Sequence, residues 1–397
     1  VNYIVSEFTE CQKAKNSGLI SAIPGGEKCM DELRSGVVRS EGFNLNGIWV
    51  PFYTYHKQLA GLRDAYRICG NREALEVAQK FADYLWDAVK GLDEEKMQRV
   101  LFCEHGGMNE VLADLYADTG EVRYFSAARR FHHRAILDPL IEGRDILPGK
   151  HANTQVPKLV GLATLYEITG NPADRDGADY FWERVVHHHS YVTGGHCDRE
   201  HFSQPDKLND RLSQDTTETC NVNNMLKLTR HVFGWRPEAK VGDFFERALY
   251  NHILSSHSPE GRVIYNLSLK QGGHKVYQRS YDDFTCCVGT GFENHVKYCD
   301  GIYFHNESNL WVNLFIASEL NWEAKGIRLT QETRYPDEST SRITLSCKKP
   351  EAFTLQIRHP GWASDGAFVK VNGVVAKASW QPASFIKMRR SLSPTSG

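Results

Sequence analysis

The chain has 397 residues, of which 41% are hydrophobic and 24% charged, and its formal net charge at pH 7 is −2. This composition is that of an ordinary globular protein, long enough for a large helical core and a second domain. The near-neutral charge and the lack of a basic run exclude the electrostatic footprint of a nucleic-acid binder. No apolar run approaches the roughly 20 residues of a membrane span. A neutral substrate fits best, and the compartment and oligomeric state stay open.

A fifty-residue repeat runs through the first half of the chain. Each copy carries a tyrosine four residues before a glycine, with apolar residues spaced i, i+3, i+4 on both sides. The copies are residues 62–85 with Gly70, 112–135 with Gly120 and 162–185 with Gly170. The pattern predicts a helix, a glycine cap and a second helix in each copy. A looser fourth copy spans residues 226–249, with Gly234 at its cap.

Repeated helix pairs form an open solenoid or a closed toroid, because each pair must bury its apolar face against its neighbours. With an opening helix in residues 1–8 and another at 288–298, we count about ten helices. A closed toroid of six pairs needs about twelve, and no N-cap residue precedes the opening helix. We therefore expect a mainly α chain with an (α/α)6-type toroid over residues 1–302 that lacks its first helices.

From about Tyr303 the sequence period changes from helical to alternating. Residues 311–316, 342–347 and 353–357 read as strands. Asn372-Gly373, between two valine-rich segments, is a hairpin turn signal. We expect an antiparallel β-sandwich over residues 303–397, with its C-terminal part incomplete.

Several side chains occupy equivalent places in the repeat. His56, His105 and Cys220 stand fourteen or fifteen residues before the cap glycines of their copies, and His151 stands nineteen before its own. Equivalent offsets place these residues at the same end of the inner helices. In a toroid that end is the rim of a central cavity, where small ligands bind. Singly, each histidine is more often structural than ligating.

We expect three thiols and a carboxylate to lie at the same rim. Glu218 lies two residues before Cys220, and Cys286-Cys287 lies just before a predicted glycine-rich turn and helix. Helix N-termini stabilise thiolates, and one carboxylate with three sulfurs suits tetrahedral Zn²⁺. Because the chain has ten cysteines, two buried free cysteines or a vicinal pair is an equally open interpretation.

Four segments resemble the cysteine-dependent β-L-arabinofuranosidases, similar to glycoside hydrolase families 127 and 146. They are LNGIWVPFYTYHKQLAGL (45–62), ETCNVNNMLKLTRHVF (218–233), FFERALYNHIL (244–254) and FTCCVGTGFENHVKY (284–298). The resemblance implies a retaining glycosidase that releases non-reducing-end β-L-arabinofuranose, or a related pentose, from a glycan or glycoside. It also implies an α/α toroid followed by β-sandwich accessories.

The resemblance assigns roles residue by residue. Zinc would be held by Glu218, Cys220, Cys286 and Cys287. Cys286 would be the nucleophile, and Glu200, in a loop before the ETC motif, would be the acid/base. The positions matching those that contact sugar hydroxyls are His56, His105, His151 and Glu246. Without the resemblance, Glu246 would be an ordinary carboxylate on a helix surface.

Two rival functions remain at this point. One is a carboxylate-based toroid glycosidase, lyase or epimerase in which zinc is purely structural. The other is a non-catalytic sugar-binding protein that keeps the metal for stability. Substitution of Cys286 separates the first rival from the thiolate mechanism, and turnover of a synthetic arabinofuranoside separates the second.

Overall fold

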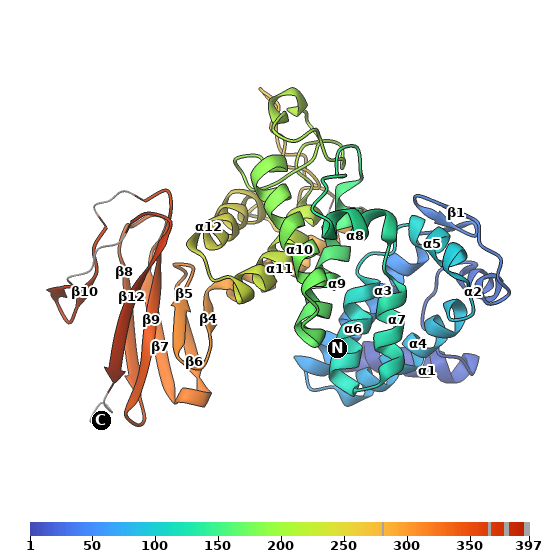
Figure 1. The fold of residues 1–397 in the computed structure, drawn as a ribbon, viewed down its shortest axis with the longest axis horizontal. Coiled ribbons are helices and arrows are strands. Elements are labelled where there is room, and N and C mark those ends of the chain that lie inside the picture. Colours follow the sequence, from blue (N-terminus) through green and yellow to red (C-terminus); the bar gives the residue numbers. More distant parts are fainter. Residues whose placement is uncertain (280–281, 364–366, 377–380, 393–397) are drawn as a thin grey trace. The chain divides into compact units, whose positions relative to one another are not determined.

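A computed structural model describes residues 1–279, 282–363, 367–376 and 381–392 (Figure 1). The chain divides into two compact units. The first comprises residues 1–189 and 200–207, and the second comprises residues 190–199 and 208–397. Each unit is described by itself. None of the helices in the described ranges is both long and apolar enough to cross a bilayer.

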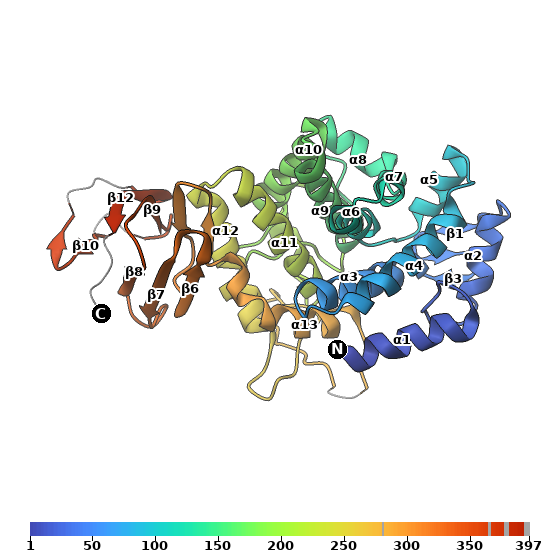
Figure 2. The ribbon, with the colours of Figure 1, turned by 90° about the horizontal axis from the view of Figure 1, so that it is seen from below.

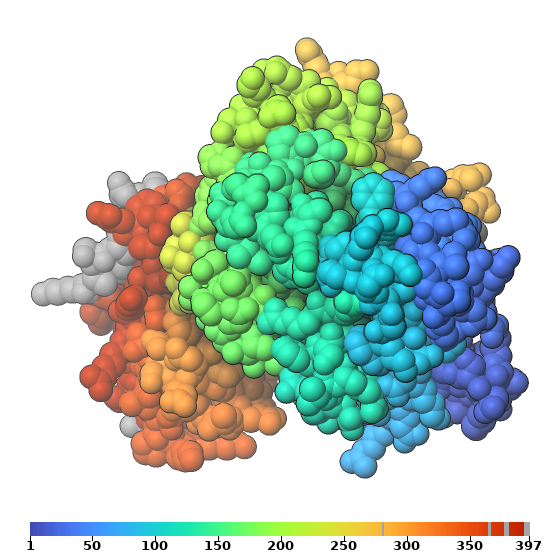
Figure 3. Space-filling view, turned by 45° about the vertical axis from the view of Figure 1, so that its right-hand side comes forward, coloured from blue at the N-terminus to red at the C-terminus, as the bar shows by residue number. Residues whose placement is uncertain are grey.

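The first unit is helical, with one small sheet. Its elements are α1 (Asn2–Lys15), α2 (Gly26–Arg34), β1 (Ser40–Glu41), β2 (Asn44–Leu45), β3 (Ile48–Trp49), α3 (Pro51–Arg67), α4 (Arg72–Val89), α5 (Glu94–Phe102), α6 (Met108–Thr119), α7 (Val122–Arg130), α8 (Arg134–Ile141), α9 (Ala152–Thr169), α10 (Pro172–Arg184) and the π-helical turn η1 (Val185–His189). The side chains of its segments up to about residue 150, coloured blue to teal, form a continuous packed surface in Figure 3.

The predicted helix, glycine, helix units are confirmed in the first unit. α6 and α9 end at Gly120 and Gly170, whose φ angles of 74° and 70° are left-handed. A glycine adopts this conformation without the steric cost that a Cβ brings. α3 ends slightly earlier than predicted, at the C-cap Ile68, and Gly70 follows with φ 68°. After α7 the chain continues into a separate short helix, α8.

The helices of the first unit form an inner and an outer row. α6 packs against both α3 and α9, while α4, α7 and α10 each pack on the inner helix that precedes them (Figure 2). All residues of α9 from 152 to 165 are buried. A helix buried on every side lies inside a helical assembly, whereas the outer helices need only one apolar face.

The second unit begins with helices and ends with strands. Its helical elements are the 3₁₀ turn η2 (Leu208–Arg211), α11 (Thr219–Trp235), α12 (Ala239–Ala248), the π turn η3 (Leu249–Ile253), η4 (Leu254–Ser256), α13 (Cys286–Val296), η5 (Tyr298–Gly301) and η6 (Glu323–Lys325). Its strands are β4 (Tyr303–His305), β5 (Asn309–Val312), β6 (Ser318–Trp322), β7 (Ile327–Thr333), β8 (Ser341–Cys347), β9 (Glu351–His359), β10 (Lys370–Val371), β11 (Val374–Val375) and β12 (Ser384–Leu392).

Two glycine predictions in the second unit are wrong. Gly234 lies inside α11, which continues to Trp235 and ends before Pro237, because the residue before a proline disfavours helical geometry. The expected glycine-rich turn after Cys287 is also helical, since α13 begins at Cys286 and includes both glycines. A Cβ at Gly291 would lie 2.5 Å from the Val263 side chain, so glycine serves close packing there rather than a turn.

The strands form two main sheets and a hairpin. One sheet has the order β12-β9-β5-β4 and the other the order β6-β7-β8. Leu310, Leu329 and Leu355, from both sheets, share one buried core. The pairing is antiparallel except between β5 and β9, which are parallel. The prediction of a purely antiparallel sandwich is therefore wrong at this pair. The predicted turn at Asn372-Gly373 is confirmed and joins β10 to β11.

Candidate active site and metal centre

One carboxylate and three thiols of the second unit come together. Glu218, Cys220, Cys286 and Cys287 offer ligand atoms that all lie within 4.8 Å of one another. Glu218 is the N-cap of α11 and Cys220 its second residue, while the cysteine pair opens α13. α11 packs against α13. Two helix starts, each with a partial positive charge, therefore meet at one group of donors, where that charge favours the carboxylate and any deprotonated sulfur.

The spacing of the donor atoms suits a tetrahedral metal. The Cys220 and Cys287 Sγ atoms are 3.3 Å apart, and Glu218 Oε1 lies 3.7 Å from Cys287 Sγ and 3.9 Å from Cys286 Sγ. Sulfurs held about 2.3 Å from zinc at tetrahedral corners are separated by about 3.8 Å. The four residues could therefore hold a metal ion, and one carboxylate with three sulfurs is a donor set chemically suited to Zn²⁺.

The three cysteines differ in how far they are buried. Glu218 is 1% exposed, Cys220 2% and Cys287 0%, whereas Cys286 is only partly buried. A buried carboxylate, and any buried thiol that loses its proton, needs a compensating cation, because uncompensated charge in the interior is costly. The donors therefore favour a bound cation, and Cys286 carries the sulfur that a substrate reaches most easily.

The thiols perturb one another's titration. The pKa of Cys286 is lowered because Cys220 and Cys287 donate hydrogen bonds to its sulfur. Burial raises the pKa values of Cys220 and Cys287 well above the usual range. Without a metal, these shifts favour deprotonation of Cys286 over deprotonation of Cys220 and Cys287. The thiolate is the nucleophilic and metal-binding form of cysteine.

Two hydroxyl groups that the sequence did not single out contact the sulfurs. Thr290 Oγ1 lies 3.0 Å from Cys220 Sγ, and Tyr265 Oη lies 3.6 Å from Cys286 Sγ. Thr290 follows Cys286 by one turn of α13, so helical spacing could have indicated it. Tyr265 has no such local signal, because it is fixed by a long-range bond from Thr219 N to its carbonyl oxygen at 2.9 Å.

A histidine and a glutamate form a second group, in the first unit. His151 is the N-cap of α9, and its Nδ1 accepts a hydrogen bond from Thr154 N at 3.3 Å. In the neutral imidazole the proton is then on Nε2, which lies 2.9 Å from Glu200 Oε2 and donates to it. Ala152 N also donates to the Glu200 carbonyl at 2.7 Å. The Glu200 side chain is 32% exposed, so its carboxylate is accessible.

His56 and His105 lie at the N-terminal ends of α3 and α6, as the repeat predicts. The His56 Nδ1 donates to the Tyr53 carbonyl at 2.9 Å, and the His105 Nδ1 to the Cys103 carbonyl at 3.0 Å. His105 is 0% exposed, and burial lowers its pKa to about 3. Among the described residues no hydrogen-bond partner reaches its Nε2. Sugar contact by either histidine stays a prediction.

Glu246 is not the exposed helix carboxylate that its sequence context suggests. It is 4% exposed on α12 and pairs with the fully buried guanidinium of Arg358 from β9. Trp362 Nε1 donates to Glu246 Oε1 at 2.6 Å, and Tyr335 Oη donates to the same oxygen at 3.3 Å. The carboxylate therefore ties α12 to the strands, and its assignment as a sugar contact stays a prediction.

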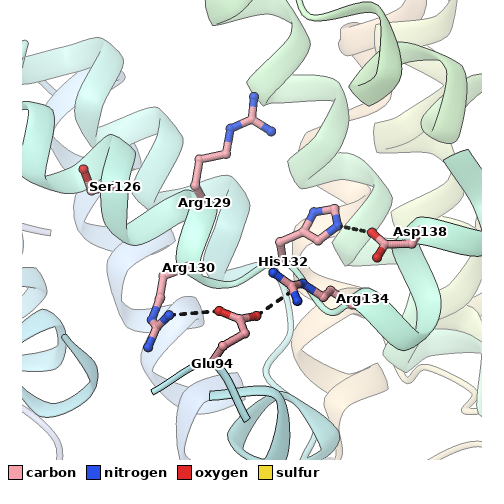
Figure 4. A pocket seen from close by; sticks show the side chains of 7 residues that line it. All are labelled: Glu94, Ser126, Arg129, Arg130, His132, Arg134 and Asp138. Atoms are coloured by element: carbon pink, nitrogen blue, oxygen red, sulfur yellow. Dashed lines mark hydrogen bonds and ion pairs between the residues drawn. The ribbon is translucent and has the colours of Figure 1, made fainter. Parts of the chain in front are cut away.

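A pocket of about 500 Å³ in the first unit is a separate feature. Figure 4 shows Glu94 between the guanidinium groups of Arg130 and Arg134, at 3.1 and 3.3 Å, and His132 bonded to Asp138. The pocket contains none of the site residues expected from the sequence. Since its carboxylates already neutralise its cations, we assign it no function.

Comparisons with known proteins point to one family. The family model described as the catalytic domain of glycoside hydrolase family 127 β-L-arabinofuranosidase matches residues 1–300, and that of its middle domain matches residues 309–396. A non-reducing-end β-L-arabinofuranosidase of Bifidobacterium longum subsp. longum is 24% identical over 363 residues, which cover 79% of this chain and 54% of that protein.

Solved structures share the fold. The crystal structure of a family 127 β-L-arabinofuranosidase from Geobacillus stearothermophilus T6 matches with a TM-score of 0.71 and 21% identity, over 93% of this chain and 62% of that one. A second family 127 β-arabinofuranosidase matches with a TM-score of 0.71 and 23% identity, over 86% and 58%. The likeness confirms the fold class, a helical toroid followed by a β-rich domain. The chain spans little more than half of the length of these relatives.

Proposed function

Because the chain belongs to the glycoside hydrolase family 127 β-L-arabinofuranosidases, we propose that it is a retaining glycosidase that releases β-L-arabinofuranose, or a related pentose, from the non-reducing end of an arabinose-containing glycan or glycoside. The group of Glu218, Cys220, Cys286 and Cys287 is the observation that carries the proposal. The catalytic domain would comprise residues 1–302 and the β-sandwich residues 303–397, boundaries that the two family matches support.

The four clustered residues would hold a zinc ion. Bound there, zinc would keep the sulfurs deprotonated at neutral pH. The carboxylate of Glu218 completes a set of four donors, as in tetrahedral protein zinc sites. The Thr290 hydroxyl would orient Cys220 by donating to its sulfur, in the way that outer partners commonly fix metal ligands.

Cys286 is the proposed nucleophile. Its sulfur is the accessible member of the group, whereas Cys220 and Cys287 are buried. The thiolate would attack the anomeric carbon, forming a thioether while the bond from that carbon to the leaving oxygen breaks. The Tyr265 hydroxyl, 3.6 Å from the sulfur, would help to aim it.

Glu200 is the proposed acid/base. It would give its proton to the leaving oxygen and later take one from the water that attacks the thioether, which restores the Cys286 thiolate. His151 holds one oxygen of the carboxylate, through Nε2, and would fix its direction in both steps. His56, His105, His151 and Glu246 are proposed to contact the sugar hydroxyls.

Substitution of Cys286 by serine tests the mechanism in the full-length protein. We expect the variant to fold, to retain zinc and to lose turnover of an aryl β-L-arabinofuranoside. Cys69→Ser, at an exposed cysteine, is the matched control and should behave like the wild type. Substantial activity in the Cys286→Ser variant would favour the carboxylate mechanism with a structural zinc. Absence of turnover by the wild type on every furanoside would favour a sugar-binding protein.

A further inference from the structure

An aromatic pair with an exposed face lies in the small sheet of the first unit. The rings of Phe43 and Trp49 are stacked, with centroids 5.4 Å apart and planes at 23°. Trp49 is 68% exposed. Large aromatic side chains lose favourable burial when they face water, so an ordered and exposed tryptophan is a feature that a ligand could use.

The backbone holds this pair in place. Trp49 pairs with Asn44 in the β2-β3 ladder, and Val50 N donates to the Phe43 carbonyl at 3.1 Å. The neighbouring Leu45 is 0% exposed and anchors the sheet in the core of the unit. The exposed ring is therefore carried on a fixed support, which lowers the entropic cost of binding.

The pair is continuous with the proposed acid/base group. The Phe43 ring packs edge-on against His151, with centroids 5.2 Å apart and planes at 76°. His151 in turn donates to Glu200 at 2.9 Å. Trp49 is thus separated from His151 by a single aromatic ring, and all four residues belong to the same compact unit.

Phe43 and Trp49 would lie on the leaving-group side of the glycosidic bond to be cleaved. A general acid protonates the oxygen that departs, so the leaving-group part of the substrate must lie beside Glu200. Polysaccharide rings present an apolar face of C–H groups, which a flat and exposed indole can cover. The sugar nearest to the leaving oxygen would therefore meet this aromatic surface.

We propose that Trp49, supported by Phe43, forms a subsite for the leaving-group sugar ring of the glycan. This inference rests on the proposed function, and in particular on Glu200 as the acid/base. Trp49 is then a specificity-determining residue: it distinguishes substrates whose leaving group is a sugar ring from those whose leaving group is a small alcohol.

The test compares two substrates in the full-length protein. One is a disaccharide with β-linked L-arabinofuranose at its non-reducing end, and the other is methyl β-L-arabinofuranoside, whose leaving group has no ring. We expect Trp49→Ala to lower kcat/KM for the disaccharide about tenfold, mainly through KM, as expected for the loss of one stacking contact. The methyl glycoside should be hydrolysed almost as by the wild type.

Two further variants keep the test decisive. Trp49→Phe retains a flat ring and should keep most of the disaccharide activity, while Phe368→Ala removes an aromatic ring of similar exposure, 62%, from the β-rich region and should change neither substrate. Equal losses on both substrates, or no loss on either, would overturn the subsite alone. A wild-type protein that hydrolyses neither substrate would overturn the proposed function and the subsite with it.

Discussion

Replacing Arg358 with methionine should destabilise the second unit strongly. The guanidinium is 0% exposed and binds two carboxylates, those of Asp243 and Glu246, whose side chains are 20% and 5% exposed. Its Nε also donates to the Asn313 carbonyl at 2.6 Å. Methionine fills much of the volume but leaves both carboxylates without their cation. Removing one partner of a buried ion pair costs about 3–5 kcal/mol, so we expect a loss of that size in the free energy of unfolding.

Denaturant unfolding followed by circular dichroism measures this loss, and its pH dependence gives a second check. Burial already raises the pKa of Asp243, and loss of the guanidinium raises it further. An acid whose pKa is higher in the folded state stabilises the fold only when protonated, so the deficit of the variant should shrink as the pH falls toward that pKa. The triple variant Asp243→Asn, Glu246→Gln, Arg358→Met should recover part of the stability. A deficit under about 1 kcal/mol, or one that is independent of pH, would refute the reasoning.

Three further predictions concern the site. Thr290→Val, which removes the hydroxyl beside Cys220, should weaken zinc binding about 10- to 100-fold in a chelator competition, whereas Thr290→Ser should not; equal affinities would refute the role of the hydroxyl. Glu200→Gln should abolish turnover of glycans but spare much of the first step with a nitrophenyl leaving group, which needs no proton, and equal losses on both would contradict the acid role. Removal of zinc with a chelator should expose thiols to a disulfide reagent, Cys286 first because it is the accessible one; a faster reaction at Cys220 or Cys287 would contradict the burial order.

The repeat explains why much of the first unit was predictable from local sequence. Gly120 and Gly170 end helices because a residue without a Cβ enters the left-handed cap conformation freely, which is a property of the residue itself. The same logic failed at Gly234 and Gly291, which serve a continuing helix and a close approach to Val263. Glycine can adopt the left-handed cap conformation, continue a helix or allow a close contact. The residues packed around it in the folded protein decide which of these occurs.

By itself, the sequence indicated one carboxylate and three thiols as candidate metal donors and placed them near helix starts, because capping and helical spacing act over a few residues. Tertiary structure alone decided that Glu218 and Cys220 meet the Cys286 pair across some seventy residues of chain, and that Tyr265 touches the Cys286 sulfur. It also decided that Glu246 is buried against Arg358 from a distant strand. These contacts depend on how separate elements pack, and packing is a property of the whole fold that no local pattern encodes.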